Sequence, residues 1–318
     1  MRVGIVGAGL AGLVAGRDLA ARGHDVVLFD KGRSPGGRLA TRRIGGATVD
    51  HGAQFFTVRS EAFAARVHEW QLTGLVVEWC RGFGPAPDGY PRYRVTGGMN
   101  ALAKKLARPL DVRTSSRVFA LRPTAAGATR PPWAIVTDDG AATDVDAAVV
   151  TCPVPQSFSL VVDSGATLPT VLRSTDYDRT LALLAVLDGP SAVPPPGGVQ
   201  QPDDTFTFVA DNEAKGLSDL PALTLHANPE WSAAWWDRPS DEAHAALRAL
   251  ATPWLGASAI VASQLKRWRF ATPRAIWPDP CWVAEGVPPL VLAGDAFAGP
   301  RVEGAALSGA AAAAALTQ

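Results

Sequence analysis

The sequence predicts an α/β protein in which a Rossmann-like domain, drawn from both ends of the chain, is joined to a second domain of mainly antiparallel strands. The first thirty residues form an apolar strand, a glycine-rich turn, a helix and a second apolar strand, which is how a parallel sheet begins. Residues 285–318 return to this style, with a buried strand that leads into a helix. Residues 156–280 differ, because they are rich in proline and tryptophan and contain short runs typical of antiparallel strands.

Length and composition narrow the classes of protein to consider. With 318 residues, 47% of them hydrophobic and 19% charged, the chain can bury the cores of two interlocked domains. A net charge of +0 gives no electrostatic reason to expect nucleic acid or an anionic membrane surface as the main partner. The three cysteines, Cys80, Cys152 and Cys281, lie far apart, which argues against a disulfide framework or a zinc site and fits the cytoplasm. We expect no signal peptide and no membrane-spanning helix.

The individual elements follow from apolar spacing and from the positions of glycine and proline. We expect strands at 2–6 and 25–29 around a helix at 10–22, whose apolar residues share one face and which Gly23 ends. Helices are expected at 61–79 and 99–106, separated by a loop at 82–94, and strands at 111–122, 133–137 and 147–152. Further along the chain we expect strands at 181–187, 205–210 and 222–226, a helix at 241–251, a strand at 290–293 and a helix from about residue 305.

These elements divide into two predicted domains. Residues 1–60, 95–155 and 285–318 form the discontinuous dinucleotide-binding domain, because the head and the tail of the chain share one style. Residues 61–94 and 156–284 form the second domain, which we expect to supply the wall of a substrate site.

A glycine-rich loop opens the first helix. It runs Gly7-Ala8-Gly9-Leu10-Ala11-Gly12, between a strand and a helix, as a dinucleotide loop requires. The first glycine makes the tight turn, the second lets the backbone approach a pyrophosphate, and the third lets the helix pack on the sheet. Asp30 ends the second strand, where a carboxylate accepts hydrogen bonds from a ribose diol. The alternative is a glycine-rich turn in an unrelated α/β protein.

Two further motifs favour FAD over NAD. Gly36-Gly37-Arg38 resembles the second signature of the glutathione-reductase-like and amine-oxidase-like flavoproteins, in which backbone and arginine lie along the pyrophosphate. The strand 290–293 ends in Gly294-Asp295, and in these flavoproteins such an aspartate bonds the ribityl chain. A helix opens at Val302-Glu303-Gly304-Ala305, and its N-terminus near the flavin pyrimidine would stabilise the anion of the reduced ring. The alternatives are a surface turn for the Gly-Gly-Arg motif and a capping role for Asp295.

Several longer segments resemble the renalase-like branch of the amine-oxidase-like flavoproteins. They are residues 50–57 (DHGAQFFT), 151–155 (TCPVP), 208–212 (FVADN), 266–269 (KRWR) and 294–297 (GDAF). The resemblance implies a fold of the p-hydroxybenzoate-hydroxylase and amine-oxidase type. It also implies an FAD-dependent oxidase of dihydro-NAD(P) isomers, in their 2- or 6-dihydro forms, that returns NAD(P)+ and passes electrons to O2 to give H2O2.

The resemblance also implies a set of site residues. Gln54 would orient flavin or substrate, while Trp268 would stack on a nicotinamide ring and Arg269 would meet a phosphate, unless Trp268 is simply packed in a sheet. Phe56 is equally compatible with a core position. The residues expected to contact the cofactor are Gly7, Ala8, Gly9, Leu10, Ala11, Gly12, Asp30, Lys31, Gly37, Arg38, His51, Gly52, Ala53, Gln54, Phe55, Val118, Gly294, Asp295, Val302, Glu303 and Ala305.

Hydride transfer to a flavin needs little from side chains, so we expect no acid–base pair, no nucleophile and no metal. The FAD is expected to be non-covalent, since no cysteine lies in a matching motif. Two alternatives stay open: a flavin amine oxidase or desaturase of another small molecule, and a non-catalytic FAD-binding protein. The scarcity of tyrosine, with only Tyr90, Tyr93 and Tyr177, counts against an aromatic cage for amines. The sequence does not choose between NADH-type and NADPH-type substrates.

Overall fold

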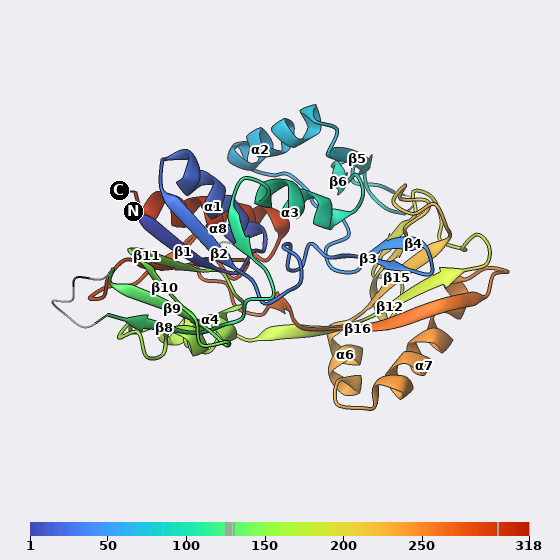
Figure 1. Cartoon of the computed structure of the whole chain (residues 1–318). Coiled ribbons are helices and arrows are strands. Elements are labelled where there is room, and N and C mark those ends of the chain that lie inside the picture. Colours follow the sequence, from blue (N-terminus) through green and yellow to red (C-terminus); the bar gives the residue numbers. More distant parts are fainter. Residues whose placement is uncertain (85, 125–128, 130, 298, 318) are drawn as a thin grey trace.

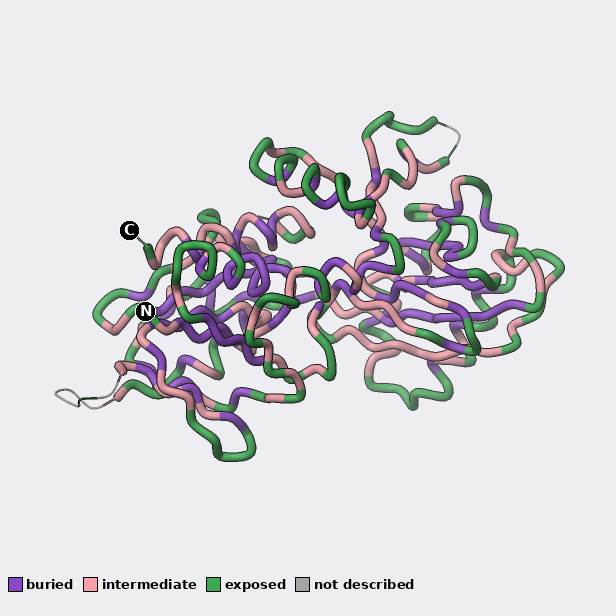
Figure 2. The backbone as a smooth tube through the Cα atoms, turned by 45° about the horizontal axis from the view of Figure 1, so that its top comes forward, coloured by how far each residue is buried: buried purple, intermediate pink, exposed green. Residues whose placement is uncertain are grey.

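The protein consists of two groups of elements that lie side by side (Figure 1). The computed structural model describes residues 1–84, 86–124, 129, 131–297 and 299–317. Both ends of the chain lie in one group, around a six-stranded sheet, and the other group is built on a five-stranded sheet. Buried residues are concentrated in the strands of these two sheets (Figure 2). The chain therefore folds as an α/β protein with a second, antiparallel part, as its sequence predicts.

The six-stranded sheet is the Rossmann-like part. Its order is β17-β18-β11-β1-β2-β7, and all its neighbours pair in parallel except β17 with β18. Its four inner strands, β18, β11, β1 and β2, are almost fully apolar, because helices or further strands cover both faces of the sheet. The strands are β1 (Arg2–Val6), β2 (Asp25–Phe29), β7 (Asp111–Arg113), β11 (Ala147–Val150), β17 (Trp282–Val283) and β18 (Leu290–Leu292).

Helices from distant parts of the chain cover one face of this sheet. The four helices share one apolar core with Val3 and Ile5 of β1. Two of them approach closely, since a Cβ on Gly309 would lie 2.1 Å from the Ala11 carbonyl oxygen. The last helix thus lies against the first. The helices are α1 (Leu10–Ala21), α2 (Glu61–Leu72), α3 (Met99–Ala107) and α8 (Val302–Ala315).

A small sheet and two helices cover the opposite face. They share a core with the sheet through residues such as Val27, Phe29 and Trp133. The elements are β8 (Val118–Pro123), β9 (Trp133–Thr137), β10 (Ala142–Val145), α4 (Val154–Val161) and α5 (Thr170–Arg173).

The second sheet is antiparallel, with the order β13-β14-β15-β12-β16. Its helices α6 and α7 pack on one face through a separate core. The hairpin of β3 and β4, which comes from the first fifty residues, packs on the other face. The elements are β3 (Thr41–Ile44), β4 (Ala47–Asp50), β12 (Tyr177–Leu187), β13 (Gly198–Gln200), β14 (Phe206–Asp211), β15 (Ala222–Ala227), α6 (Pro229–Trp235), α7 (Ser240–Leu250), a 3-10 turn at Thr252–Trp254, and β16 (Ile260–Pro273).

The structure differs from the predicted elements at residues 61–79 and 111–122, and it also contains α4 and β16, which lie outside the predicted elements. The helix expected at 61–79 ends at Leu72, because the chain turns at Gly74 (φ +68°) into β5 (Val76–Cys80), which pairs with β6 (Arg92–Val95). The strand expected at 111–122 is two strands, interrupted where Ser115 takes a φ of +51°. The last helix begins at Val302, within the segment Val302–Ala305 at which the sequence predicts its start.

The place of α2 differs from the domain division that the sequence suggested. Its apolar residues Phe63, Val67 and Trp70 join the core beneath the six-stranded sheet, although residues 61–94 were assigned to the second domain. The amphipathic pattern identified a buried face without saying which partner buries it. Within the described residues, no helix is long and apolar enough to cross a membrane.

Candidate functional site

The two predicted glycine loops lie against each other. The Gly36 N–H donates to the Ala8 carbonyl oxygen at 2.8 Å, and Gly9 and Gly36 form a parallel bridge. Gly37 takes a φ of +55°, which an L side chain rarely adopts, and a Cβ on it would lie 3.5 Å from the Cα of Gly9. Two motifs separated by more than twenty residues therefore form one backbone surface at the N-terminus of α1.

The glycines of the first loop differ in what they accommodate. A Cβ on Gly12 would lie 2.0 Å from the Gly7 carbonyl oxygen, so the protein's own packing requires glycine there. A Cβ on Gly9 would meet no protein atom within 4 Å beyond its chain neighbours. Gly9 precedes the first turn of α1, in which Leu10 and Ala11 are buried. The open space at Gly9 fits a dinucleotide pyrophosphate that approaches the N–H groups of this helix.

Asp30 is anchored in this loop. Its Oδ2 accepts the Ala8 N–H at 2.8 Å and its Oδ1 accepts the Gly32 N–H at 2.7 Å. A carboxylate has about four acceptor positions, so two hydrogen bonds leave capacity for a ribose diol. Lys31 lies on the surface, where its Nζ donates to Gln156 at 3.3 Å, and Val118 is buried in β8.

Arg38 and Asp295 form an ion pair that joins the two ends of the chain. The guanidinium meets the carboxylate at both oxygens, with Nη2 to Oδ1 at 2.8 Å, and Nη1 also donates to the Ala271 carbonyl oxygen at 3.2 Å. The Tyr177 hydroxyl donates to Asp295 Oδ1 at 3.4 Å. Burial, and then the Asp295 charge, raises the pKa of Tyr177, so it stays protonated. The residues predicted to hold the pyrophosphate and the ribityl chain thus lie in direct contact.

The segment after β4 packs against the backbone of Arg38. The Ala53 N–H donates to the Arg38 carbonyl oxygen at 2.9 Å, and a Cβ on Gly52 would lie 1.9 Å from that oxygen. Both backbone polar groups of His51 are used within the protein. Its N–H donates to Ala40 at 2.9 Å and its carbonyl oxygen accepts the Trp268 indole N–H at 2.7 Å.

Two buried polar atoms in this segment have no hydrogen-bond partner among the described residues, namely Gln54 Oε1 and His51 Nδ1. Gln54 is fixed by its amide nitrogen, which donates to the Asp50 carbonyl oxygen at 2.8 Å and to that of Gly52 at 3.2 Å. Burial, with the charges of Lys266 and Arg42, lowers the pKa of His51 to about 3, so its ring is neutral at pH 7. Unpaired buried polar atoms are costly, which makes Gln54 and His51 suitable contacts for a bound group.

The two phenylalanines of this segment have different surroundings. Phe56 is a core residue, packed against Phe63 and Tyr93 at centroid distances of 5.8 and 5.7 Å. Phe55 lies in an aromatic group with ring centroids 5.3 to 6.2 Å from its own. The other members of this group are Trp79, Phe83 and Phe208.

Trp268 and Arg269 have different surroundings. The Trp268 ring stacks on His51, with centroids 5.3 Å apart and planes at 24°. Arg269 follows Trp268 where the pairing of β12 with β16 becomes irregular, and it is exposed. That Trp268 and Arg269 line one substrate wall stays a prediction.

The first turn of α8 carries the remaining predicted residues. The Glu303 carboxylate accepts the N–H groups of Arg59 and Ser60 at 3.0 and 2.8 Å, and the Ser60 hydroxyl at 2.6 Å. Its charge therefore stabilises the start of α2. Val302 and Ala305 share this turn, and Gly294 is fixed by an N–H bond to the Ser308 hydroxyl at 2.8 Å.

A buried ion pair was not foreseen from the sequence. Lys215 Nζ lies 2.8 Å from Asp50 Oδ2, and the two side chains are 1% and 0% exposed. Asp50 Oδ1 accepts the Thr41 hydroxyl at 2.5 Å and the Met99 N–H, at the start of α3, at 2.9 Å. Burial lowers the pKa of Lys215, which Asp50 opposes. Asp50 closes an apolar strand, which is a signal of burial, but nothing local marks Lys215 as its partner.

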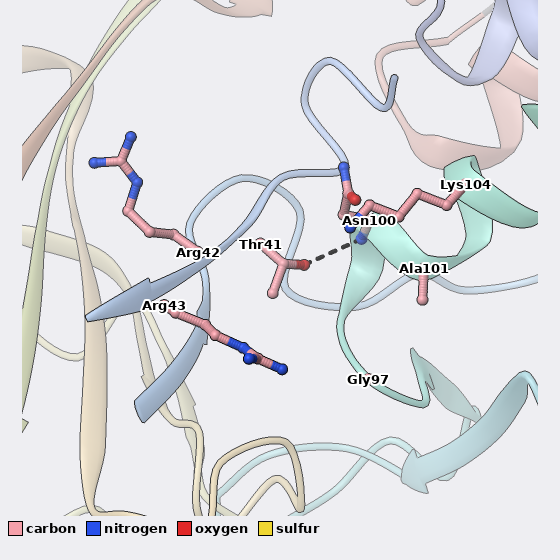
Figure 3. A pocket seen from close by; sticks show the side chains of 7 residues that line it. All are labelled: Thr41, Arg42, Arg43, Gly97, Asn100, Ala101 and Lys104. Carbon is pink, nitrogen blue, oxygen red and sulfur yellow. Dashed lines mark hydrogen bonds between the residues drawn. The ribbon is translucent and has the colours of Figure 1, made fainter. Parts of the chain in front are cut away.

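A separate groove of about 280 Å³ lies between β3 and α3 (Figure 3). Arg43 extends from β3 toward α3, while Arg42 points to the other side of the strand (Figure 3). The groove is lined by Thr41, Arg42, Arg43, Gly97, Asn100, Ala101 and Lys104. Among the described residues, no group of three or more histidine, cysteine or acidic side chains could hold a metal.

Comparison with known proteins identifies both parts of the chain. The profile of an NAD(P)-binding Rossmann-like domain matches residues 5–69, and that of the flavin containing amine oxidoreductases matches residues 61–317. The hydroxyneurosporene desaturase of Rubrivivax gelatinosus is 49% identical over 67 residues, which are 20% of this chain and 13% of the desaturase. The chain thus spans only about an eighth of that relative.

Solved structures share the fold over the full chain. A putrescine oxidase bound to putrescine superposes with a TM-score of 0.74 at 15% identity, covering 100% of both chains. A cyclohexylamine oxidase from Brevibacterium oxydans IH-35A superposes with a TM-score of 0.73 at 13% identity, covering 100% of this chain and 99% of that one. At such low identity, these likenesses establish the fold alone.

Proposed function

Because the chain belongs to the family of flavin-containing amine oxidoreductases, we propose that it is a renalase-like oxidase that uses non-covalent FAD to oxidise dihydro-NAD(P) isomers. Its substrates are the 2- or 6-dihydro forms. The balanced reaction takes the isomer, O2 and a proton to NAD(P)+ and H2O2. When bound, the flavin accepts the hydride and passes the electron pair to oxygen.

The residues that hold the cofactor are those of the joined glycine loops. The open space at Gly9 and the N–H groups at the start of α1 suit the pyrophosphate, and Asp30 suits the adenosine ribose. Arg38 and Asp295 fix the loops of both chain ends relative to each other, and Gln54 offers an unpaired acceptor to the flavin or the substrate. Burial raises the pKa of Cys152 to about 12, which keeps the thiol protonated and unreactive.

One observation favours a dihydronicotinamide over an amine as the substrate. The carboxylates of Asp50, Asp295 and Glu303 are already paired with Lys215, with Arg38 and with the start of α2. A cationic amine in a buried site needs an unpaired carboxylate as the partner of its ammonium group. None of these three carboxylates is free to serve as that partner. A neutral His51 and the Trp268 ring instead suit a flat, uncharged dihydronicotinamide.

The test is anaerobic mixing of the FAD-loaded protein with 2- and 6-dihydro-NAD(P), followed by the absorbance of the flavin. We expect bleaching within seconds and formation of H2O2 when air is admitted, whereas putrescine and cyclohexylamine leave the flavin oxidised. Bleaching by an amine and not by the isomers would favour the second candidate, an amine oxidase or desaturase, which the family supports. A flavin that no donor reduces, and that does not react with oxygen after dithionite reduction, would indicate a non-catalytic FAD-binding protein.

A separate measurement tests whether the FAD is bound non-covalently. After acid precipitation, we expect the yellow colour to remain in the supernatant. Colour in the pellet would contradict this part of the proposal.

A further inference from the structure

A row of polar side chains follows one face of β16 toward the hairpin of β3 and β4. Arg42 Nη1 donates to Gln264 Oε1 at 2.6 Å, and Lys266 Nζ lies 5.3 Å from the ring centroid of Trp268. Residues 264, 266 and 268 alternate with residues that face α6 and α7, so they share one face of the strand. Trp268 ends the row, with its indole N–H on the His51 carbonyl oxygen.

The two cations of this row lack acidic partners. Among the residues that the structure describes, no carboxylate lies within ion-pairing distance, 4.0 Å, of Arg42 or Lys266. Both side chains are partly buried. Burial, and then the Arg42 charge, lowers the pKa of Lys266, so the positive charge of Arg42 acts on Lys266. Cations kept close together without acidic partners are typical of sites that bind anions.

The row connects these cations to the predicted ring site. Trp268 stacks on His51, and the next residues, Gly52 to Gln54, are those expected beside the flavin. Along a strand, residues two apart are separated by roughly 7 Å, so Lys266 and Arg42 lie successively farther from Trp268. An anionic group bound there would belong to the same molecule as a ring held at Trp268.

We propose that Arg42 and Lys266 form an anion site that binds the phosphate groups of the substrate, so that the enzyme acts on nucleotides and not on their nucleosides. This inference rests on the proposed function, for which it names the residues that hold the phosphate groups of the dinucleotide. Arg42 offers a planar set of donors that can grip a phosphate, and Lys266 offers a compact positive charge. Arg269, which was also expected to meet a phosphate, is exposed, whereas Arg42 and Lys266 are partly buried.

The test uses binding to the FAD-loaded protein, without turnover. ADP and adenosine are titrated separately by calorimetry into the wild type and into Arg42→Gln, Lys266→Gln and Arg43→Gln. Arg43 is the matched control, because it is the next residue of β3, is exposed, and points to the opposite side (Figure 3). We expect Arg42→Gln and Lys266→Gln each to weaken ADP binding by about 10-fold to 100-fold. Arg43→Gln should change it by less than about threefold, and adenosine should bind with no dependence on the variant.

Stopped-flow reduction provides the second readout. For the dihydro isomers of the dinucleotide, Arg42→Gln should raise the apparent dissociation constant and leave the limiting rate of flavin reduction unchanged. For the dihydro isomers of nicotinamide riboside, which carry no phosphate, it should change neither. Wild-type flavin content and melting temperature in each variant would establish that it is folded.

The outcomes separate the two proposals. Equal binding of ADP and adenosine to the wild type, or equal losses in Arg42→Gln and Arg43→Gln, would overturn the anion site. Flavin that the isomers do not reduce would overturn the proposed function, while the ADP titration would still decide whether Arg42 and Lys266 bind phosphate.

Discussion

Replacing Gly9 with alanine tests whether glycine is needed at this position for FAD binding or for the packing of the protein itself. Gly9 has an extended backbone, with φ −74° and ψ −178°, which alanine adopts without strain. A Cβ at this position meets no protein atom within 4 Å beyond its chain neighbours. The substitution should therefore leave the flavin-free protein as stable as the wild type or more stable, by up to about 1 kcal/mol, because alanine restricts the unfolded chain.

The same methyl group should weaken FAD binding. If it displaces the pyrophosphate from the start of α1, at least one charge-assisted hydrogen bond is lost, which costs about 1.5–3 kcal/mol. That corresponds to a rise in the dissociation constant of FAD by about 10-fold to 160-fold. Gly12→Ala is the matched comparison, since its Cβ would lie 2.0 Å from the Gly7 carbonyl oxygen and must distort the loop even without FAD.

The assay pairs urea unfolding of the flavin-free proteins with titration of FAD by its fluorescence. Gly9→Ala should change only the FAD titration, whereas Gly12→Ala should lower the free energy of unfolding as well. The reasoning is refuted if Gly9→Ala binds FAD as tightly as the wild type. It is also refuted if Gly9→Ala destabilises the flavin-free protein as much as Gly12→Ala does.

Two further predictions concern buried charges. Lys215→Met leaves the Asp50 carboxylate buried without its cation, so the free energy of unfolding measured in urea should fall by about 3–5 kcal/mol. Adding Asp50→Asn should restore part of that loss, and a loss below about 1 kcal/mol in the single variant would contradict the pairing. Burial lowers the pKa of His226 to about 4, below its unfolded value of 6.5, so the unfolded chain takes up the proton first and stability falls as the pH drops from 6.5 to 4. His226→Gln should reduce that fall by up to about 3 kcal/mol in urea unfolding followed against pH, and an unchanged pH profile would show that the native ring accepts the proton freely.

The features predicted correctly from the sequence are those that a local pattern of residues determines, such as the positions of short apolar strands. Strands β1 and β2 occupy the residues expected for them, because a buried parallel strand is a continuous apolar run. Strand β9, which is antiparallel, also occupies the residues expected for it. Pairings across the chain left no such local trace. Arg38 and Asp295 are 257 positions apart, and each was expected to contact the cofactor, not the other.

Strand β16, which carries Trp268 and Arg269, lies outside the predicted elements. Most of its residues are half-buried and their burial does not alternate, so it lacks the period-two pattern that marks a strand with one buried face. Lys215 is the harder case, since a lysine in a polar loop is ordinarily solvated and only the fold brings it to Asp50.

The His51 peptide explains how the two parts of the site keep their relative position. Its N–H donates to Ala40, in the segment that follows the Gly-Gly-Arg motif, and its carbonyl oxygen accepts from Trp268 of β16 and His226 of β15. The backbone of one residue therefore joins the predicted cofactor loops to the sheet that carries the predicted substrate wall. Because these bonds use the backbone of His51, they do not depend on its imidazole, which is left to stack on Trp268. If flavin and substrate bind as proposed, backbone hydrogen bonds set the distance between them, while the side chains along β16 determine which substrate binds.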